Sequence, residues 1–305
     1  SGLSLADGSH SASNYTIGSS SFAVTRRNVT VSGEKVYDGS GNVSFNNIDT
    51  INTAGGETLT LSGQGSVDLP SVGTNKSITL GTLGITNGTT GTIGLASNYT
   101  LDSGTLDITN KTITLTGSRQ YDGSTDVKSS DITLIGEVSG ESIRITGTGS
   151  VSDKNVGSSK SINTTGLSLA DDTSNSSNYS LSTGTFNINR KVLDISGTRS
   201  YDATTSVSSG STTLSGLIGS ETLNKSGSVT ISSANAATYL SASINTSLFS
   251  LSDGSNGGLS ANYTLSGGSH SVTISQKSIG ANGSKVYDGT TSVSSSNLSL
   301  TGLVG

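Results

Sequence analysis

Apolar and polar residues alternate along short stretches of the chain. Between residues 111 and 190, the alternation covers 112–116, 142–146, 161–163, 167–169, 179–181 and 186–189. A period of two predicts half-buried β-strands, and the Gly, Asn, Asp and Ser clusters between these stretches predict turns. No convincing apolar pattern has the helical spacing of 3.6 residues. The chain is therefore predicted to be all-β.

Two short motifs recur in step and reveal an internal repeat. The tyrosines of the first motif, Tyr-Asp-Gly/Ala, are 84, 80 and 86 positions apart, and they are Tyr37, Tyr121, Tyr201 and Tyr287. Those of the second motif, Asn-Tyr-Thr/Ser, are 84, 80 and 84 positions apart, and they are Tyr15, Tyr99, Tyr179 and Tyr263. Only Tyr239 stands outside both sets. Two independent motifs in one register predict tandem domains.

Other residues follow the same register. A basic residue begins each unit, at Arg27, Lys111, Lys191 and Lys277, and an acidic residue opens a later Thr/Ser-Leu/Ile run at Glu57, Glu141 and Glu221. The complete repeats are therefore predicted at 27–110, 111–190 and 191–276. Residues 1–26 match the C-terminal part of a repeat, and residues 277–305 match the N-terminal part.

The joins between repeats lack a spacer. The strand pattern that ends one repeat runs into the pattern that begins the next, at 106–113 and 186–195, without a Gly/Ser or Pro linker. This predicts a limited range of angles between neighbours and hence an elongated, semi-rigid rod. For the two incomplete repeats, either the sequence covers part of a longer array or neighbouring subunits complete them by strand addition.

Composition indicates domains with small cores. Hydrophobic residues make up 30% of the chain and aromatic residues only 4%, so each unit of this length buries little apolar surface. Many short strands joined by turns predict a tandem array of small, immunoglobulin-like β-sandwich domains. A β-helix is the rival fold, but its coil repeat is much shorter than the period found here.

The same composition narrows the function classes. The chain contains no Cys, which rules out disulfides and thiolate metal sites, and its net charge of −5 argues against nucleic-acid binding. No apolar run approaches about 18 residues, so we expect no membrane insertion in this segment. His10 and His270 are the only imidazoles, so the middle of the chain, more than two complete repeats, has no His to act as the base that a nucleophilic serine needs. We therefore expect no enzymatic activity.

Three motifs in their order and spacing resemble those of a known family. Residues 285–291, Lys-Val-Tyr-Asp-Gly-Thr-Thr, resemble the signature of the YDG domain; residues 153–160 resemble its second motif, and Asn-Tyr-Thr-Leu its third. The resemblance covers essentially the whole chain. YDG repeats, which are similar to MBG repeats, occur in large bacterial exoproteins that resemble filamentous-haemagglutinin-type adhesins exported by two-partner secretion.

This resemblance implies a structural stalk or fibre at the bacterial cell surface, outside the cell, that serves adhesion or biofilm formation. It implies no catalytic residues. The alternatives are a polymerising subunit of an extracellular filament and a glycan-binding adhesive module. The third repeat departs from the pattern at Ala203 and at residues 233–237, so a binding function that needs the family's groups would be lost there.

The repeat signature is expected to be structural. Asp should cap a turn, Gly should supply its backbone freedom and Tyr should pack, while recognition by the tyrosines is the alternative. The tyrosine of Asn-Tyr-Thr/Ser should anchor a small core. The signature residues are Tyr37, Asp38, Gly39, Tyr121, Asp122, Gly123, Tyr201, Asp202, Tyr287, Asp288, Gly289, Tyr15, Tyr99, Tyr179 and Tyr263.

No cofactor or metal site is expected. The acidic loops 170–175 and 252–256 offer oxygen ligands, which leaves Ca²⁺ as a secondary alternative to ordinary turns. The expected partners are other copies of the chain, in a filament or between cells, or host and surface glycans. Asn-x-Ser/Thr sequons are abundant, so glycosylation at asparagine is an open alternative.

Overall fold

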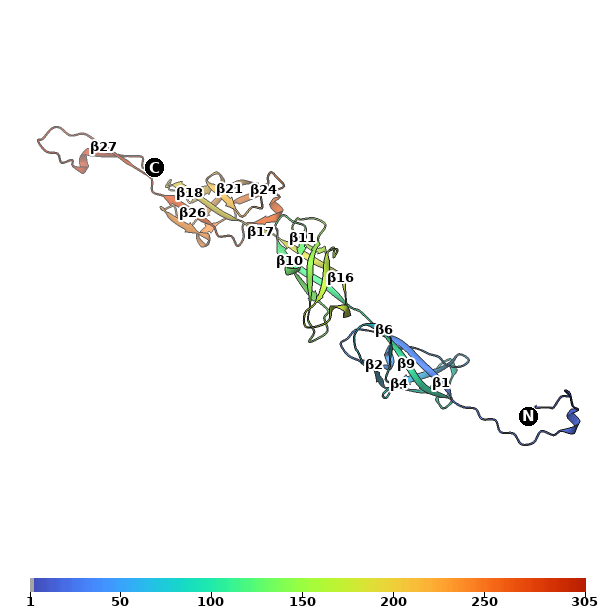
Figure 1. Cartoon of the computed structure of the whole chain (residues 1–305). Coiled ribbons are helices and arrows are strands. Elements are labelled where there is room, and N and C mark those ends of the chain that lie inside the picture. The colour runs from blue at the N-terminus through green and yellow to red at the C-terminus, as the bar shows by residue number, and fades with distance from the viewer. Residues whose placement is uncertain (1–2) are drawn as a thin grey trace. The chain divides into compact units, whose positions relative to one another are not determined.

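The chain consists of short β-strands joined by turns, as a computed structural model describes for residues 3–305 (Figure 1). Helical structure in this range consists of three-residue 3₁₀ turns, so the prediction of an all-β chain is confirmed. None of these described helices is long and apolar enough to span a bilayer. The turns are η1 (Ala12–Asn14), η2 (Phe45–Asn47), η3 (Ala96–Asn98), η4 (Ser129–Asp131), η5 (Ser176–Asn178), η6 (Ser209–Ser211), η7 (Ser241–Ser243), η8 (Ser260–Asn262) and η9 (Ser295–Asn297).

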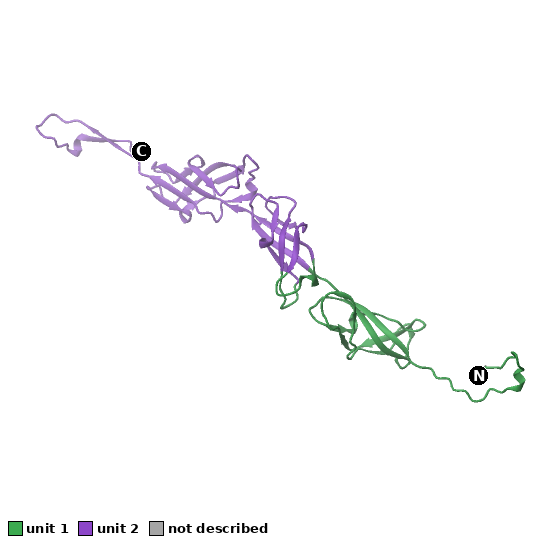
Figure 2. Ribbon diagram, in the orientation of Figure 1, with its two compact units in different colours: residues 1–112, 137–143, 171–180 green, residues 113–136, 144–170, 181–305 purple. Residues whose placement is uncertain are grey.

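The described residues fall into two compact units (Figure 2). One contains the chain as far as Thr112 together with residues 137–143 and 171–180. The other contains residues 113–136, 144–170 and 181–305. Two loops of the second repeat therefore belong to the same compact unit as the whole first repeat.

The first repeat is built on a pair of parallel strands. Its strands are β1 (Arg27–Val36), β2 (Asn42–Ser44), β3 (Ile48–Ile51), β4 (Glu57–Ser62), β5 (Gln64–Ser66), β6 (Gly73–Ser77), β7 (Gly84–Asn87), β8 (Thr92–Ile93) and β9 (Tyr99–Thr109). The main sheet has the order β3-β1-β9-β6, and β1 pairs with β9 from Arg27 opposite Tyr99 to Val36 opposite Thr109. Smaller sheets pair β2 with β5, and β4 with β7 and β8.

The second repeat has the same main sheet. Its strands are β10 (Lys111–Gln120), β11 (Asp126–Lys128), β12 (Ile132–Ile135), β13 (Ile143–Ser150), β14 (Gly157–Ser161), β15 (Leu167–Asp171) and β16 (Tyr179–Asn189). The order β12-β10-β16-β14 matches β3-β1-β9-β6 strand for strand, and a second sheet has the order β11-β13-β15.

The third repeat follows this plan with more, shorter strands. They are β17 (Lys191–Val192), β18 (Asp194–Ser200), β19 (Ser206–Ser208), β20 (Thr212–Ser215), β21 (Leu223–Ile231), β22 (Ala237–Leu240), β23 (Ile244–Asn245), β24 (Phe249–Asp253), β25 (Tyr263–Thr264) and β26 (Ser271–Ser275). One sheet has the order β20-β18-β26-β22 and another β19-β21-β23, with β24 also paired to β21. The short strands β17 and β25 pair in parallel.

Both larger sheets of the third repeat contribute to one core. Ile195 and Val272 come from the first sheet, and Val229 and Phe249 come from β21 and its neighbour β24. These side chains are buried because the alternation of apolar and polar residues directs every second one to the same face of its strand. The core is small, as the low aromatic content predicts.

Consecutive repeats are joined almost strand to strand. Only Asn110 separates β9 from β10, and only Arg190 separates β16 from β17. After the third repeat the connection is longer, because the next strand, β27 (Gly280–Gly283), begins five residues after β26 ends at Ser275.

The two incomplete repeats leave apolar side chains exposed. Residues 3–26 form no strand, and their regular structure is the 3₁₀ turn η1. Phe22 and Val24 are 91% and 87% exposed. Their counterparts in the first repeat, Leu106 and Ile108, are buried in the core. At the other end, β27 forms a hairpin with β28 (Leu298–Thr301), and every residue of both strands is exposed.

Tyr239, which belongs to neither tyrosine set, fills the place of a lysine. It lies opposite Val272 in the ladder, where Lys76 and Lys160 lie opposite the corresponding residues of the first two repeats. Lys160 forms an ion pair with Asp153, whereas Tyr239 is buried and its hydroxyl donates to the Asn235 carbonyl (2.8 Å). A buried ring therefore replaces an ion pair where the third repeat departs from the second motif.

Replacing Tyr239 tests this exchange. Tyr239→Phe removes one neutral hydrogen bond and should lower the free energy of unfolding of the third repeat by about 1 kcal/mol. Tyr239→Ala should cost about 3–5 kcal/mol, because it leaves a cavity beside Val272. Urea unfolding measures both. An alanine variant as stable as the phenylalanine variant would show that the ring contributes nothing to the core.

Candidate functional site at the repeat junctions

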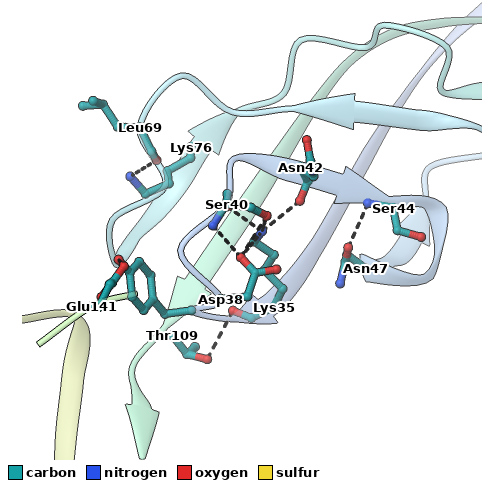
Figure 3. Close-up of polar contacts among 11 residues, drawn as sticks. Lys35, Asp38, Ser40, Asn42, Ser44, Asn47, Leu69, Lys76, Thr109 and Glu141 are labelled. Atoms are coloured by element: carbon teal, nitrogen blue, oxygen red, sulfur yellow. Dashed lines mark hydrogen bonds and ion pairs between the residues drawn. The ribbon is translucent and has the colours of Figure 1, made fainter. Parts of the chain in front are cut away.

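The Tyr-Asp-Gly motif of the first repeat forms a turn around a buried lysine. The Lys35 amino group donates to Asp38 Oδ1 (2.9 Å), the Ser40 carbonyl (2.7 Å) and the Asn42 carbonyl (2.8 Å) (Figure 3). Asp38 Oδ1 also accepts the Ser40 backbone N–H at 2.9 Å. Burial acts to raise the pKa of Asp38, but the hydrogen bonds from Lys35 and Ser40 outweigh it and lower that pKa. The lysine thus ties the turn to both of its flanks.

The same turn occurs at the other three copies of the motif. The basic residue three positions before the aspartate pairs with it at Arg119–Asp122, Arg199–Asp202 and Lys285–Asp288. The residue after each aspartate has a positive φ of 79° at Gly39, Gly123 and Gly289 and of 63° at Ala203. This conformation disfavours a side chain, so Ala203 holds a backbone geometry that suits glycine better.

A carboxylate joins the tyrosine of this turn to a tyrosine of the next repeat. The Tyr37 hydroxyl donates to Glu141 Oε1 (2.6 Å), and the Tyr179 hydroxyl donates to Glu141 Oε2 (2.5 Å). The two rings meet edge to face, with centroids 5.6 Å apart. The Val138 N–H completes the set by donating to the Tyr179 hydroxyl (3.1 Å). We call the arrangement of Tyr37, Glu141 and Tyr179 a Tyr–Glu–Tyr clamp.

The second junction has the same clamp. Tyr121 and Tyr263 donate to the two oxygens of Glu221, each at 2.6 Å, and their rings also meet edge to face, with centroids 5.5 Å apart. The Ile218 N–H donates to the Tyr263 hydroxyl (3.1 Å), as the Val138 N–H does to Tyr179. Because the two copies have nearly identical geometry, the clamp is a recurring feature of the contact between consecutive repeats.

Among the residues that the structure describes, only the second clamp contains a cation. Lys154 Nζ lies 3.3 Å from Glu221 Oε1 and 6.0 Å from the centroid of the Tyr121 ring. Burial acts to raise the pKa of Glu221, but the hydrogen bonds from the two tyrosines and Lys154 outweigh it and lower that pKa. In the first repeat Pro70 occupies the position of Lys154, so this position supplies no cation to Glu141.

The second and third motifs also meet at these junctions. The buried Asn178 accepts the Val72 N–H through Oδ1 (3.0 Å), and Asn262 accepts the Val156 N–H in the same way (2.9 Å). Asn262 Nδ2 further donates to Asn155 Oδ1 at 3.0 Å. The first and second motifs of one repeat therefore both contact the third motif of the next repeat.

The glycine of the motif permits this close approach. A Cβ on Gly39 would lie 2.9 Å from Val138 Cγ1, and a Cβ on Gly123 would lie 2.8 Å from Ile218 Cγ2. Real Cβ atoms essentially never come so close to another heavy atom. Glycine is thus required at both positions by its neighbour as well as by its φ angle.

The remaining signature tyrosines are not clamped. Tyr15 and Tyr287 are exposed, and Tyr201 is half-buried beside an open cavity of about 400 Å³ that Ala236, Lys277 and Leu303 also line. Tyr99 is buried and donates to Glu57.

The repeat register shows that Glu57, Glu141 and Glu221 are equivalent, but the sequence did not assign them a role. Their recurrence in a chain with only 12% charged residues was the available signal.

Neither histidine belongs to the clamps. His270 is buried, accepts the Ile195 N–H through Nδ1 (3.1 Å) and lies with Nε2 3.0 Å from the Leu265 carbonyl, whereas His10 is exposed. His270 thus connects the start of β18 to the Leu265 carbonyl, a contact that the sequence did not predict.

The acidic loops use their carboxylates in turns. Asp171 accepts from the backbone and side chain of Ser176, and Asp253 does so from Ser260. Within residues 3–305, no group of three or more His, Cys, Asp or Glu side chains is placed to hold a metal ion.

The sequon asparagines differ in accessibility. Asn178 and Asn262 are buried and hydrogen-bonded at the junctions, so a glycan on either would disrupt the contact. Asn14 and Asn98 are exposed.

Comparison with known proteins identifies one family. The sequence model of the family described as YDG domain matches residues 23–106 and again residues 105–186. No curated protein and no solved structure matches the chain.

Neutralising the carboxylate of a clamp should weaken it. Glu221→Gln should lower the free energy of unfolding by about 2 kcal/mol, because hydrogen bonds to a charged group are stronger than neutral ones and Lys154 loses its partner. Glu141→Gln, without a lysine, should cost about 1 kcal/mol. Urea unfolding measures both, and Glu34→Gln, an exposed carboxylate on β1, is the matched control. Equal stabilities for all three variants would contradict the role of the clamp.

Alkaline pH should loosen the clamps. Burial, and next the hydrogen bond to Glu141, raise the pKa of both Tyr37 and Tyr179 from 10.0 to about 12. The unfolded chain loses these protons at a lower pH than the folded chain, so the free energy of unfolding should be unaffected by these groups below pH 10 and should fall between pH 10 and about 12.

Thermal unfolding from pH 8 to 12, with tyrosinate absorbance recorded in parallel, measures this effect. Tyr37→Phe should make the fall in stability shallower, whereas Tyr15→Phe, at an exposed tyrosine, should leave it unchanged. An identical pH dependence in the Tyr37→Phe variant would contradict the assignment.

Proposed function

Because the chain belongs to the YDG-domain family, we propose that it is a stalk or fibre segment of a secreted bacterial surface protein that serves adhesion or biofilm formation. In this proposal the repeats supply length and stiffness, and binding to a target occurs elsewhere in the assembly. The Tyr–Glu–Tyr clamp is the observation that supports it most directly, because the family's signature residues hold neighbouring repeats together.

The energetics of the clamp support a stiff joint. Hydrogen bonds to a carboxylate contribute about 1.5–3 kcal/mol each, and each clamp has two of them together with an edge-to-face ring contact. Separating two repeats would also expose the buried tyrosine rings and the asparagine contact to water. With a one-residue connection, such as Asn110, the joint has few ways to bend without breaking these contacts.

We further propose that each complete repeat is a small sandwich of the immunoglobulin-like type and that successive repeats form an elongated rod. Support comes from the shared core of the two larger sheets in the third repeat and from the identical order of the main sheets. Secretion, a position at the cell surface and two-partner export are proposed from the family resemblance. The absence of Cys from the sequence is compatible with them.

The glycan-binding alternative has less support at the tyrosines. A glycan platform needs an accessible aromatic face, but Tyr37 and Tyr121 are only 5% and 1% exposed and lie against the next repeat. Their hydroxyls are already engaged by Glu141 and Glu221. The clamp therefore covers the tyrosine surfaces that a glycan would have to contact.

Small-angle scattering tests the proposed rod. A compact globule of 305 residues would have a radius of gyration of about 19 Å, and we expect a value well above this. The double variant Glu141→Gln, Glu221→Gln should broaden the distribution of interatomic distances by loosening both joints, whereas Glu34→Gln should not. A wild-type radius near that of a globule would overturn the proposal.

A further inference from the structure

A lysine, a carboxylate and an asparagine meet at the second junction. Lys154 comes from the second repeat, and Glu221 and Asn262 come from the third. Lys154 Nζ lies 3.3 Å from Glu221 Oε1. Asn262 is held against the loop of the lysine, because its Nδ2 donates to Asn155 Oδ1 (3.0 Å) and its Oδ1 accepts the Val156 N–H (2.9 Å). An amine, a carboxylate and a side-chain amide thus lie at one boundary between repeats.

Neighbours in the sequence connect these three groups. Asn262 precedes Tyr263, whose hydroxyl donates to Glu221 Oε2 (2.6 Å), and Lys154 precedes Asn155, which accepts from Asn262. Asn262 and Glu221 are buried, whereas the Lys154 side chain is 39% exposed. The lysine therefore has room to move, and its four-carbon stem is flexible. Rotation of this stem is the movement that carries Nζ from the carboxylate towards the amide carbon of Asn262.

The contacts of the group suit the transfer of an acyl group to the amine. A nucleophile needs a base within hydrogen-bond reach, and Glu221 lies beside Lys154 for this purpose. The Val156 N–H donates to the side-chain oxygen of Asn262, where negative charge develops when an amine adds to the carbon. The buried rings of Tyr121 and Tyr263 flank the carboxylate, so the proton transfers occur away from bulk water.

We propose that Lys154 and Asn262 form an isopeptide bond that joins the second repeat covalently to the third, and that Glu221 transfers the protons. The hydrogen bond to Glu221, and next that to Tyr121, raise the pKa of Lys154, so the amine carries its extra proton at rest. The reaction therefore begins with the transfer of this proton from Lys154 to Glu221, which leaves a neutral amine beside a neutral carboxylic acid.

The remaining steps balance without a further reactant. Nζ forms a bond to Cγ of Asn262, and one proton of the amine passes by way of the Glu221 carboxyl group to Nδ2. The bond between Cγ and Nδ2 then breaks, and ammonia leaves with the proton that Glu221 had taken from the lysine. A lysine ammonium and an asparagine amide thus become an isopeptide and an ammonium ion, and Glu221 returns to its starting state.

The first junction serves as an internal control. It has the carboxylate of Glu141 and the buried Asn178, which accepts the Val72 N–H as Asn262 accepts that of Val156. The position of Lys154 is taken by Pro70, which supplies no amine. The bond is therefore expected at the second junction and not at the first. It does not depend on the proposed fibre function, because it is detected by the mass of the chain and not by scattering.

Mass spectrometry of the intact, folded chain tests the bond. The wild type should be lighter than its sequence by one molecule of ammonia. Because trypsin does not cleave after an acylated lysine, the digest should contain a branched peptide that joins residues 145–160 to residues 226–277. A succinimide at an asparagine also releases ammonia but leaves no branched peptide. The full mass of the sequence, or a loss of ammonia without the branched peptide, would overturn the proposal.

Variants assign the roles within the group. Lys154→Arg and Asn262→Ala each remove a reacting group and should abolish the branched peptide. Glu221→Gln cannot accept the proton and should slow formation of the bond at least about a hundredfold. The matched control is Lys160→Arg, at another ion pair of the second repeat, which should form the bond like the wild type.

Lys154→Arg separates loss of the bond from loss of the fold. This variant retains Glu221 with both of its tyrosine donors, so circular dichroism should show the β-structure of the wild type. A branched peptide in the Lys154→Arg digest would show that another lysine forms the link and would overturn the proposal. Formation of the bond in Glu221→Gln at the wild-type rate would overturn the role of the carboxylate.

Discussion

The carboxylates of Glu141 and Glu221 are each shared by two tyrosines from neighbouring repeats, and the organisation of the chain depends on this contact. A buried carboxylate is costly unless its oxygens accept hydrogen bonds. Here one tyrosine is supplied by each repeat, so neither repeat satisfies the charge alone. The hydrogen bonds from one tyrosine of each repeat offset the cost of desolvating the carboxylate when the two repeats pack together. This explains why the signature residues lie at the boundary and not in the centre of a repeat.

The joints differ in composition although they share a design. The second joint has Lys154 beside Glu221, whereas the first has Pro70 at that position. After the third repeat the connection is longer, Ala203 replaces the glycine of the turn, and an open cavity lies next to Tyr201. Each boundary between repeats therefore has its own set of contacts. Joints that share one design thus differ from each other by one or two polar contacts.

The sequence predicted the elements of the fold better than their contacts. Alternation of apolar and polar residues indicated the strands, and the Asp-Gly chemistry at Asp38 indicated a turn, because both signals are local. The clamp was not predicted, since the repeat register shows that Glu141 and Glu221 are equivalent but not which tyrosines they meet. The exchange of a lysine for Tyr239 was also missed, because only the ladder places it opposite Val272. Contacts between residues that are far apart in the sequence depend on how the strands pack, and no local pattern in a single sequence indicates them.

Each complete repeat carries both halves of the joint: a glutamate with an Asn-Tyr pair for the repeat before it, and a Tyr-Asp-Gly/Ala turn for the repeat after it. Removing residues 111–190 as a block would bring the turn of Tyr37 into line with Glu221 and Tyr263, the same chemical partners that it has now. Duplication or deletion of whole units in the gene would therefore change the length of the protein without requiring compensating substitutions. Recombination between repeats is thus a route by which the number of repeats can change independently of the fold.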